Sequence, residues 1–82
     1  MGWVVQHGKS VCLGNAQDDP RYFPRKEGIC SELCVPLPVG KHVIGAINIE
    51  TSKPNAYTAA DQRLLETLAA QMAIAIQNSQ LL

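Results

Sequence analysis

The side chains that could do chemistry are three cysteines, two histidines and a few scattered carboxylates. Cys12, Cys30 and Cys34 form no CxxC pair, and neither His7 nor His42 belongs to a histidine-rich segment, so the spacing favours neither a disulfide framework nor a zinc site. The motifs of lipases, P-loop enzymes, dinucleotide-binding enzymes and zinc proteases are missing. On these motifs the chain is predicted not to be an enzyme and to hold no metal.

Each of these side chains also has a structural interpretation. Cys34 lies in an apolar run and is expected to be a small buried residue, whereas Cys30 follows a polar segment and is the thiol to test for reactivity. The adjacent Asp18 and Asp19 precede Pro20, which is typical of a loop and a cap rather than of an acid/base pair. The two histidines are expected near turns at the surface.

The length and charge of the chain limit its possible architecture and partners. The chain has 82 residues, seven basic and seven acidic, which predicts one small domain whose core is completed by a partner chain. Without a basic cluster, nucleic acid is not expected as a partner. No apolar segment is long enough for membrane insertion and no secretory signal is evident, so a reduced, cytoplasmic setting is expected.

The expected elements form an antiparallel α+β fold. The sequence predicts a helical turn over 2–8 ended by Gly8, a strand over 10–13, a polar loop over 17–28, a hairpin of strands 31–39 and 42–51, and a helix over 58–82. Gly40 and Lys41 form the hairpin loop, with Gly40 at the first position of a type II′ turn. Thr58 is expected to cap the last helix, with Asp61 at its third position.

A two-residue loop also fixes a register. Val39 is then opposite His42, and the pairs that follow are Leu37 with Ile44, Val35 with Ala46, and Leu33 with Asn48. Alternation would place Leu33, Val35, Ala46 and Asn48 on one face, and Cys34 with Ile47 on the other. Pro36 and Pro38 predict an edge or a bulge in the first strand.

The last helix carries more apolar surface than one small sheet can cover. No charged residue follows Glu66, and a heptad-like stripe is formed by Leu65, Leu68, Met72, Ala75, Ser79 and Leu82. One apolar stripe is expected on the sheet and another against a second chain. The alternative is that all of these residues belong to an ordinary intrachain core.

Several segments in order resemble the second half of a GAF domain. This resemblance implies an antiparallel sheet with the terminal helix on one face and a small-molecule pocket, roofed by the polar loop, on the other. Residues 1–82 would be a partial GAF-like domain, truncated at the N-terminus. The segments are 2–5 (GWVV), 7–11 (HGKSV), 19–22 (DPRY), 31–37 (SELCVPL), 43–49 (VIGAINI), 57–61 (YTAAD), 64–65 (LL) and 69–71 (AAQ).

The signatures of the different GAF subtypes match this sequence to different degrees. The signature of cyclic-nucleotide-binding GAF domains and the Cys-His pair of bilin-binding ones are not seen. Ser31 and Glu32 match the free methionine sulfoxide reductases, which are enzymes on this fold. Cys30 lacks the sequence context of their reactive cysteine.

The resemblance implies a sensory module of histidine kinases, cyclases, phosphodiesterases or transcriptional regulators, one that binds a small molecule, dimerises, or does both. A ligand-free dimerisation and relay module and a thiol reductase are the alternatives. A homodimer is expected through the terminal helix, the edge of strand 42–51, or both, since that strand lacks an outer neighbour. No cofactor is named by the sequence. The expected ligand-binding residues are Arg21, Tyr22, Cys30, Leu33, Val35, Ala46 and Asn48.

Overall fold

The computed structural model describes residues 2–22 and 26–80, and it has the α+β architecture that the sequence predicts. Parts of the expected loop (23–25) and of the expected last helix (81–82, with Leu82 of the stripe) lie outside the described residues. The elements are helix α1 (Gly2–His7), strand β1 (Val11–Leu13), the 3-10 turn η1 (Ala16–Asp18), strands β2 (Ser31–Val39) and β3 (His42–Thr51), and helix α2 (Ala59–Gln80).

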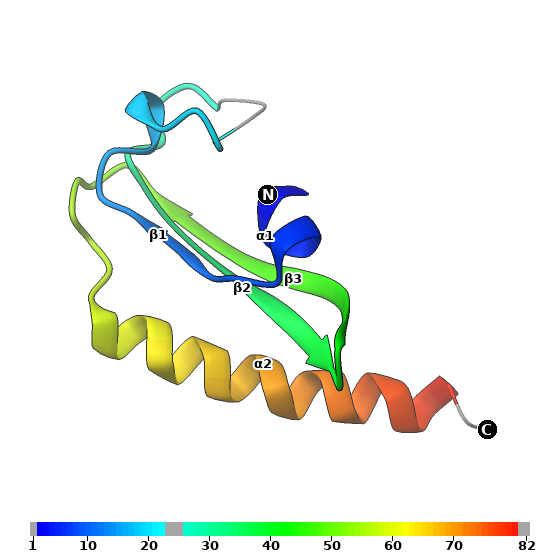
Figure 1. Ribbon diagram of the computed structural model, residues 1–82. Helices are drawn as coiled ribbons and strands as arrows, with labels where there is room; N and C mark the ends of the chain where they lie inside the picture. Colours follow the sequence, from blue (N-terminus) through cyan, green and yellow to red (C-terminus); the bar gives the residue numbers. More distant parts are fainter. Residues whose placement is uncertain (1, 23–25, 81–82) are drawn as a thin grey trace.

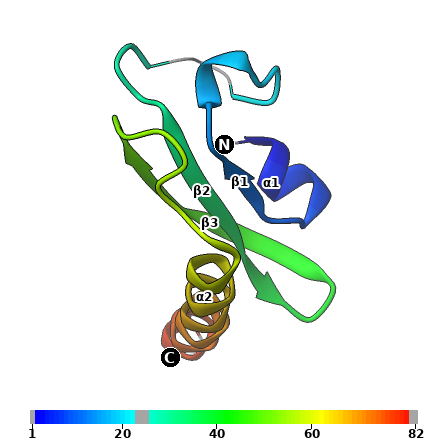
Figure 2. The same cartoon turned by 90° about the vertical axis from the view of Figure 1, so that its left-hand side faces the viewer.

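The three strands form one antiparallel sheet in the order β1-β2-β3. Helix α2 covers one face of this sheet, whereas α1 lies on the other face, next to the segment that links β1 to β2 (Figures 1 and 2). Strand β2 is therefore enclosed on both faces and both edges, and its residues from Ser31 to Val35 are all buried. Among the described residues no strand pairs with the outer edge of β3.

Two apolar cores lie on the two faces of β2. The core under α2 joins Leu33, Val35 and Leu37 to two fully buried helix residues, Ala69 and Ala73. The core on the α1 face is formed by Val4, Val11, Leu13, Ala16, Tyr22 and Cys34. Side chains of successive β2 residues thus pack in opposite cores, as the alternation of side chains along a strand requires.

The turns and caps of the sequence analysis are confirmed. Gly8 follows α1 with a φ of 68°, and Gly40 has a φ of 58°, the positive value that a type II′ turn needs at its first position. At the start of α2, the Thr58 hydroxyl accepts from the Asp61 N–H (3.1 Å), and the Asp61 carboxylate accepts from the Thr58 N–H (2.8 Å). These two bonds form a reciprocal capping box.

The predicted register of the hairpin is wrong beyond its first pair. Val39 is opposite His42 as expected, but an irregularity between Leu37 and Pro38 makes Gly45, rather than Ile44, the partner of Leu37. Pro38 has no N–H to donate to the ladder, and a bulge accommodates the extra residue there.

A shift of one residue exchanges the faces of β3 relative to β2. Ile47 and Ile49 lie opposite Val35 and Leu33, under α2, and Asn48 lies opposite Cys34 on the α1 face. Cys34 is buried, as predicted, but not on the face of Ile47. The expected group of Leu33, Val35, Ala46 and Asn48 is therefore divided between the two faces of the sheet.

Helix α2 covers the sheet with one side only. Ala69 and Ala73 are fully buried and Leu65 packs beside them. Much of the apolar surface elsewhere on the helix is in contact with solvent, including two members of the heptad-like stripe, Leu68 (45% exposed) and Met72 (47% exposed). The interpretation that all apolar helix residues belong to one intrachain core is therefore wrong.

Candidate functional site

Two carboxylates face each other on the side of the sheet opposite α2. Glu32 of β2 pairs with Glu50 of β3, and the next pair on this face is Cys34 with Asn48. Like charges directly opposite on neighbouring strands are unfavourable, so a sheet that only needed stability would not place them there. These four residues are called the acidic face below.

The Glu32 side chain lies almost wholly out of solvent. It is 1% exposed, and its Oε2 atom has no hydrogen-bond partner within residues 2–22 and 26–80. Glu50 has two hydrogen-bond donors, because its Oε1 accepts from the Asn48 amide (2.6 Å) and from Lys26 Nζ (3.3 Å). A buried carboxylate oxygen without a donor is costly, and such an atom needs a physical explanation.

The environment of Glu32 disfavours its charged form. Burial raises the pKa of the Glu32 carboxyl above its ordinary value, and the Glu50 carboxylate raises it further, while the charge of the N-terminal amino group, the Asn48 amide and Lys26 lower it. Burial also raises the pKa of the neighbouring Cys34 thiol. In the free protein, therefore, a proton binds to this face more readily than to an exposed glutamate.

The raised pKa of Glu32 predicts a pH-dependent stability. Because the folded protein holds this proton more tightly than the unfolded chain, the stabilisation is complete below the ordinary glutamate pKa and is lost as pH rises through the folded-state pKa. We expect the wild-type melting temperature to fall over this window, and we expect Glu32→Gln to remove that fall. Thermal melts of both proteins across the acidic to neutral range measure it. Parallel pH profiles would contradict the assignment.

The described parts of the segment between β1 and β2, residues 16–22 and 26–30, cover one end of the acidic face and are called the covering segment below. Tyr22 is buried (4% exposed) and its hydroxyl accepts from the Lys26 N–H (3.3 Å). Arg21 forms a two-point ion pair with Asp19 (2.8 and 3.0 Å), and its guanidinium lies 5.0 Å from the ring centre of Trp3 on α1. These contacts tie the covering segment to itself and to α1.

The cysteines differ in their environments. Burial raises the pKa of Cys12 as well as that of Cys34, with Asp61 adding to the effect at Cys12, so neither thiol is activated as a thiolate. Cys30 is half-buried at the end of the covering segment, and its Sγ lies 3.6 Å from the Gly14 carbonyl. Because part of Cys30 is in contact with solvent, the reactivity of its thiol can be tested with a thiol reagent.

The structure brings some of the predicted ligand-binding residues together and separates others. Tyr22 and Ala46 pack in the core of the α1 face, and Asn48 lies beside Glu50. Leu33 and Val35 lie under α2 instead, and the register shift places Ala46 and Asn48 on the face opposite to them. Whether any of the seven binds a ligand stays a prediction.

Sequence reasoning missed Glu32 and Glu50 as site residues. The signal for Glu32 was a carboxylate at the start of an otherwise apolar strand, and it was noted only as part of a family match. Asn48 was expected among apolar neighbours, but it is exposed and donates to Glu50. The correct register, which makes Glu32 and Glu50 opposite residues, was needed to see the pair.

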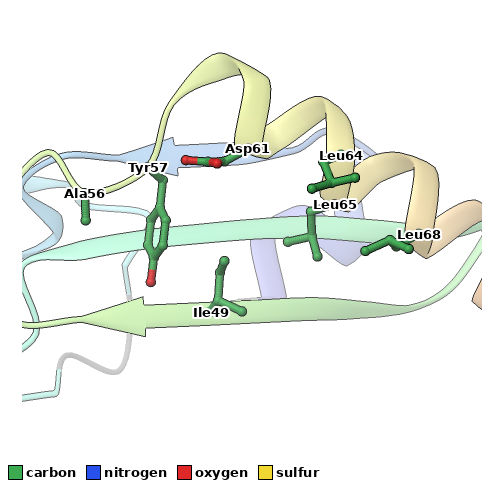
Figure 3. Close-up of a pocket in the computed structure, with 7 residues that line it drawn as sticks. All are labelled: Ile49, Ala56, Tyr57, Asp61, Leu64, Leu65 and Leu68. Carbon is green, nitrogen blue, oxygen red and sulfur yellow. The ribbon is translucent and has the colours of Figure 1, made fainter.

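A second feature is an open groove between α2 and β3, with a volume of about 340 Å³ (Figure 3). Its only charged lining residue, Asp61, is already engaged in the helix cap. The lining is mostly apolar, and Tyr57 adds a hydroxyl to it. It consists of Ile49, Ala56, Tyr57, Asp61, Leu64, Leu65 and Leu68.

Within residues 2–22 and 26–80, no cluster of three or more His, Cys, Asp or Glu side chains could hold a metal ion. In the same part of the chain no helix is long and apolar enough to cross a membrane.

Comparisons with known proteins agree with this fold. A family model described as "GAF domain" matches residues 1–77. Similar solved structures include the GAF domain from an Acinetobacter phosphoenolpyruvate-protein phosphotransferase, with 28% identity over 96% of this chain and 47% of that one, and a TM-score of 0.83. No curated protein matches the chain.

Other similar structures are enzymes. Type II free methionine-R-sulfoxide reductase from Thermoplasma acidophilum has 25% identity over 93% of this chain and 54% of that one, with a TM-score of 0.84. The free methionine-R-sulfoxide reductase from Neisseria meningitidis, solved with its substrate, has 22% identity over 96% and 47%, with a TM-score of 0.88. The chain spans about half the length of these solved chains.

These neighbours correct the expectation that the chain is not an enzyme. That expectation rested on missing hydrolase, phosphate and zinc motifs, none of which a thiol reductase needs. Because free methionine-R-sulfoxide reductases have the same fold as this chain, the absence of those motifs does not support a purely non-catalytic role.

Proposed function

This chain belongs to the GAF domain family, and from that premise we propose that it is the small-molecule-binding part of a signalling protein. Membership supports a signalling or ligand-binding module in general. On our proposal the ligand lies on the acidic face, beneath residues 16–22 and 26–30, and its binding alters the contacts of this covering segment.

The observation that carries this proposal is the buried Glu32 carboxylate with its unpartnered Oε2. A ligand that donates a hydrogen bond to this atom would remove the cost of leaving it unsatisfied. Glu50 lies opposite Glu32, and the exposed Asn48 donates to Glu50 on the same face, so polar side chains lead from the position of Glu32 to solvent.

The charges on this face favour one ligand class. Glu32 and Glu50 carry two carboxyl groups, and two cationic groups, Lys26 and the N-terminal amino group, act on Glu32, while Arg21 is occupied by Asp19. The cations already engaged on this face show that its carboxyl groups suit an ammonium group, which would meet two acceptors here, whereas a cyclic nucleotide would bring a phosphate beside them. We propose that the ligand is a small molecule with an ammonium group, such as a free amino acid or an amine.

A thermal-shift screen tests this proposal. The panel contains free amino acids, linear amines and cyclic nucleotides at matched ionic strength. We expect at least one ammonium-bearing compound to raise the melting temperature of the wild-type chain, and we expect cyclic nucleotides to leave it unchanged. Stabilisation by a cyclic nucleotide, with none by any ammonium compound, would overturn the proposed ligand class.

Thiol-dependent reduction of free methionine sulfoxide is a second candidate function, favoured by the likeness to the Thermoplasma enzyme and by the half-buried Cys30, two residues before Glu32. It is tested by following free methionine sulfoxide with dithiothreitol as the reductant. Turnover that is lost in Cys30→Ser but kept in Cys12→Ser would support this candidate. Equal rates with and without the protein would dismiss it.

A further inference from the structure

The sheet itself holds Glu32 and Glu50 close together. They are directly opposite each other on β2 and β3, where the Cβ atoms of an antiparallel pair lie roughly 4.5–5.5 Å apart. Neither residue can move away without breaking the ladder between the two strands. Two negative charges at this separation repel each other, and the repulsion is stronger where burial removes the screening water. The geometry therefore favours a face that binds a proton or a cation.

The two carboxyl groups differ in their partners. Glu50 Oε1 accepts from the Asn48 amide and from Lys26 Nζ, and both donors favour the charged form of Glu50. Glu32 is 1% exposed, and its Oε2 has no hydrogen-bond partner within the described part of the chain. A negative charge is therefore less stable on Glu32 than on Glu50, and a proton that binds to this face resides on Glu32.

The groups around Glu32 come from several elements. Burial and the Glu50 carboxylate of β3 raise the pKa of the Glu32 carboxyl, whereas the N-terminal amino group and Lys26 of the covering segment lower it. On β2 itself, burial raises the pKa of the Cys34 thiol, so this neighbour is uncharged. Strand β1 places the apolar Leu13 opposite Glu32. Because the raising effects exceed the lowering ones, the folded protein binds this proton more tightly than the unfolded chain does.

A proton and an ammonium group would relieve the same unfavourable charge in different ways. The proton removes the charge of Glu32, and with it the repulsion from Glu50. An ammonium group instead needs the charged carboxylate, because a charge-assisted hydrogen bond to Oε2 is the stronger contact. A protonated Glu32 has lost the charge that attracts the ammonium group, so the two compete for one carboxyl.

We propose that Glu32 exchanges its proton for the ammonium group of the ligand, so that each binding event releases one proton and acid weakens binding. The exchange rests on the proposed function, because it needs a ligand that carries an ammonium group. The O–H bond of the Glu32 carboxyl breaks and its proton passes to water, while every N–H bond of the ligand stays intact. A carboxylic acid and an ammonium cation thus give an ion pair and one proton, with no change in total charge.

NMR of the Glu32 side-chain carboxyl carbon across a pH series tests the exchange, with Glu32→Gln assigning the signal. In the free protein we expect Glu32 to titrate above the ordinary glutamate pKa. Butylammonium is the probe, and tetramethylammonium, which has the same charge but no N–H, is the control at equal ionic strength. Butylammonium is expected to lower the pKa of Glu32, and tetramethylammonium to leave it unchanged. The Kd of butylammonium is expected to rise about tenfold for each pH unit below the free-protein pKa and to be constant above it.

Three variants test the source of the effect in the free protein. Glu50→Gln is expected to lower the pKa of Glu32, because it removes the opposing charge, and Lys26→Met is expected to raise it. Glu66→Gln, the same change as Glu50→Gln at an exposed residue of α2, is expected to leave it unchanged. Equal effects of Glu50→Gln and Glu66→Gln would overturn the exchange.

Two other results would also contradict the exchange, and they differ in what they imply for the ligand. A butylammonium Kd that is the same above and below the Glu32 pKa would overturn the exchange and leave the proposed ligand class in place. If no ammonium compound of the thermal-shift panel binds at any pH, the proposed ligand class fails, and the exchange fails with it even where Glu32 titrates as expected.

Discussion

Replacing Ala73 by aspartate is expected to unfold the protein. Ala73 is fully buried where α2 meets β2, against Leu33 and Val35. The new carboxylate would be buried without a partner in an apolar core, at a cost of several kcal/mol. A small domain has a total stability of only about 5 kcal/mol, so this cost removes the folded state.

Far-UV circular dichroism and a thermal melt measure the effect. Ile74→Asp is the matched control, since the adjacent residue is 58% exposed on the same helix. The control is expected to keep the wild-type spectrum and to melt cooperatively. A cooperative melt of Ala73→Asp close to that of the control would mean that α2 does not pack on β2 through this residue.

The second large effect is expected at Glu32, in the binding of an ammonium-bearing ligand found by the thermal-shift screen. Glu32→Gln should weaken that binding by about tenfold or more, because a hydrogen bond to a charged group contributes about 1.5–3 kcal/mol. The same substitution should stabilise the free protein at neutral pH, since it removes a buried carboxylate that lacks a donor.

Weaker ligand binding together with a more stable free protein distinguishes a lost ligand contact from a folding defect. Glu66→Gln makes the same chemical change at an exposed residue of α2, across the sheet from the acidic face, and should leave the affinity unchanged. Isothermal titration calorimetry on the three proteins measures the affinities. Wild-type affinity in Glu32→Gln would remove Glu32 from the binding site.

The sequence predicted those parts of the fold that local chemistry determines. The capping box at Thr58 and Asp61 and the turn at Gly40 depend on short-range bonds and backbone angles, and both are present. The bounds of the hairpin strands were also predicted, because its apolar runs end at turn residues.

The candidate site was predicted only in part, because it depends on a single backbone irregularity. Two prolines indicated a bulge or an edge, but not that the ladder would omit Ile44. That one-residue shift decides whether Asn48 is opposite Leu33 or Cys34, and so which side chains share a face. The burial of Glu32 could not be predicted either, because it results from the packing of α1 and the covering segment on β2, which are contacts between distant parts of the chain.

On our proposal a ligand binds on the acidic face and not in the groove beside α2. NMR of the isotope-labelled chain, titrated with the strongest ammonium compound of the screen, distinguishes the two places. We predict shifts in the Asn48 side-chain amide and the Ala46 methyl group, with the Leu64 and Leu68 methyl groups unchanged. Shifts confined to Leu64, Leu68 and Ile49 would place the ligand in the groove and contradict the account.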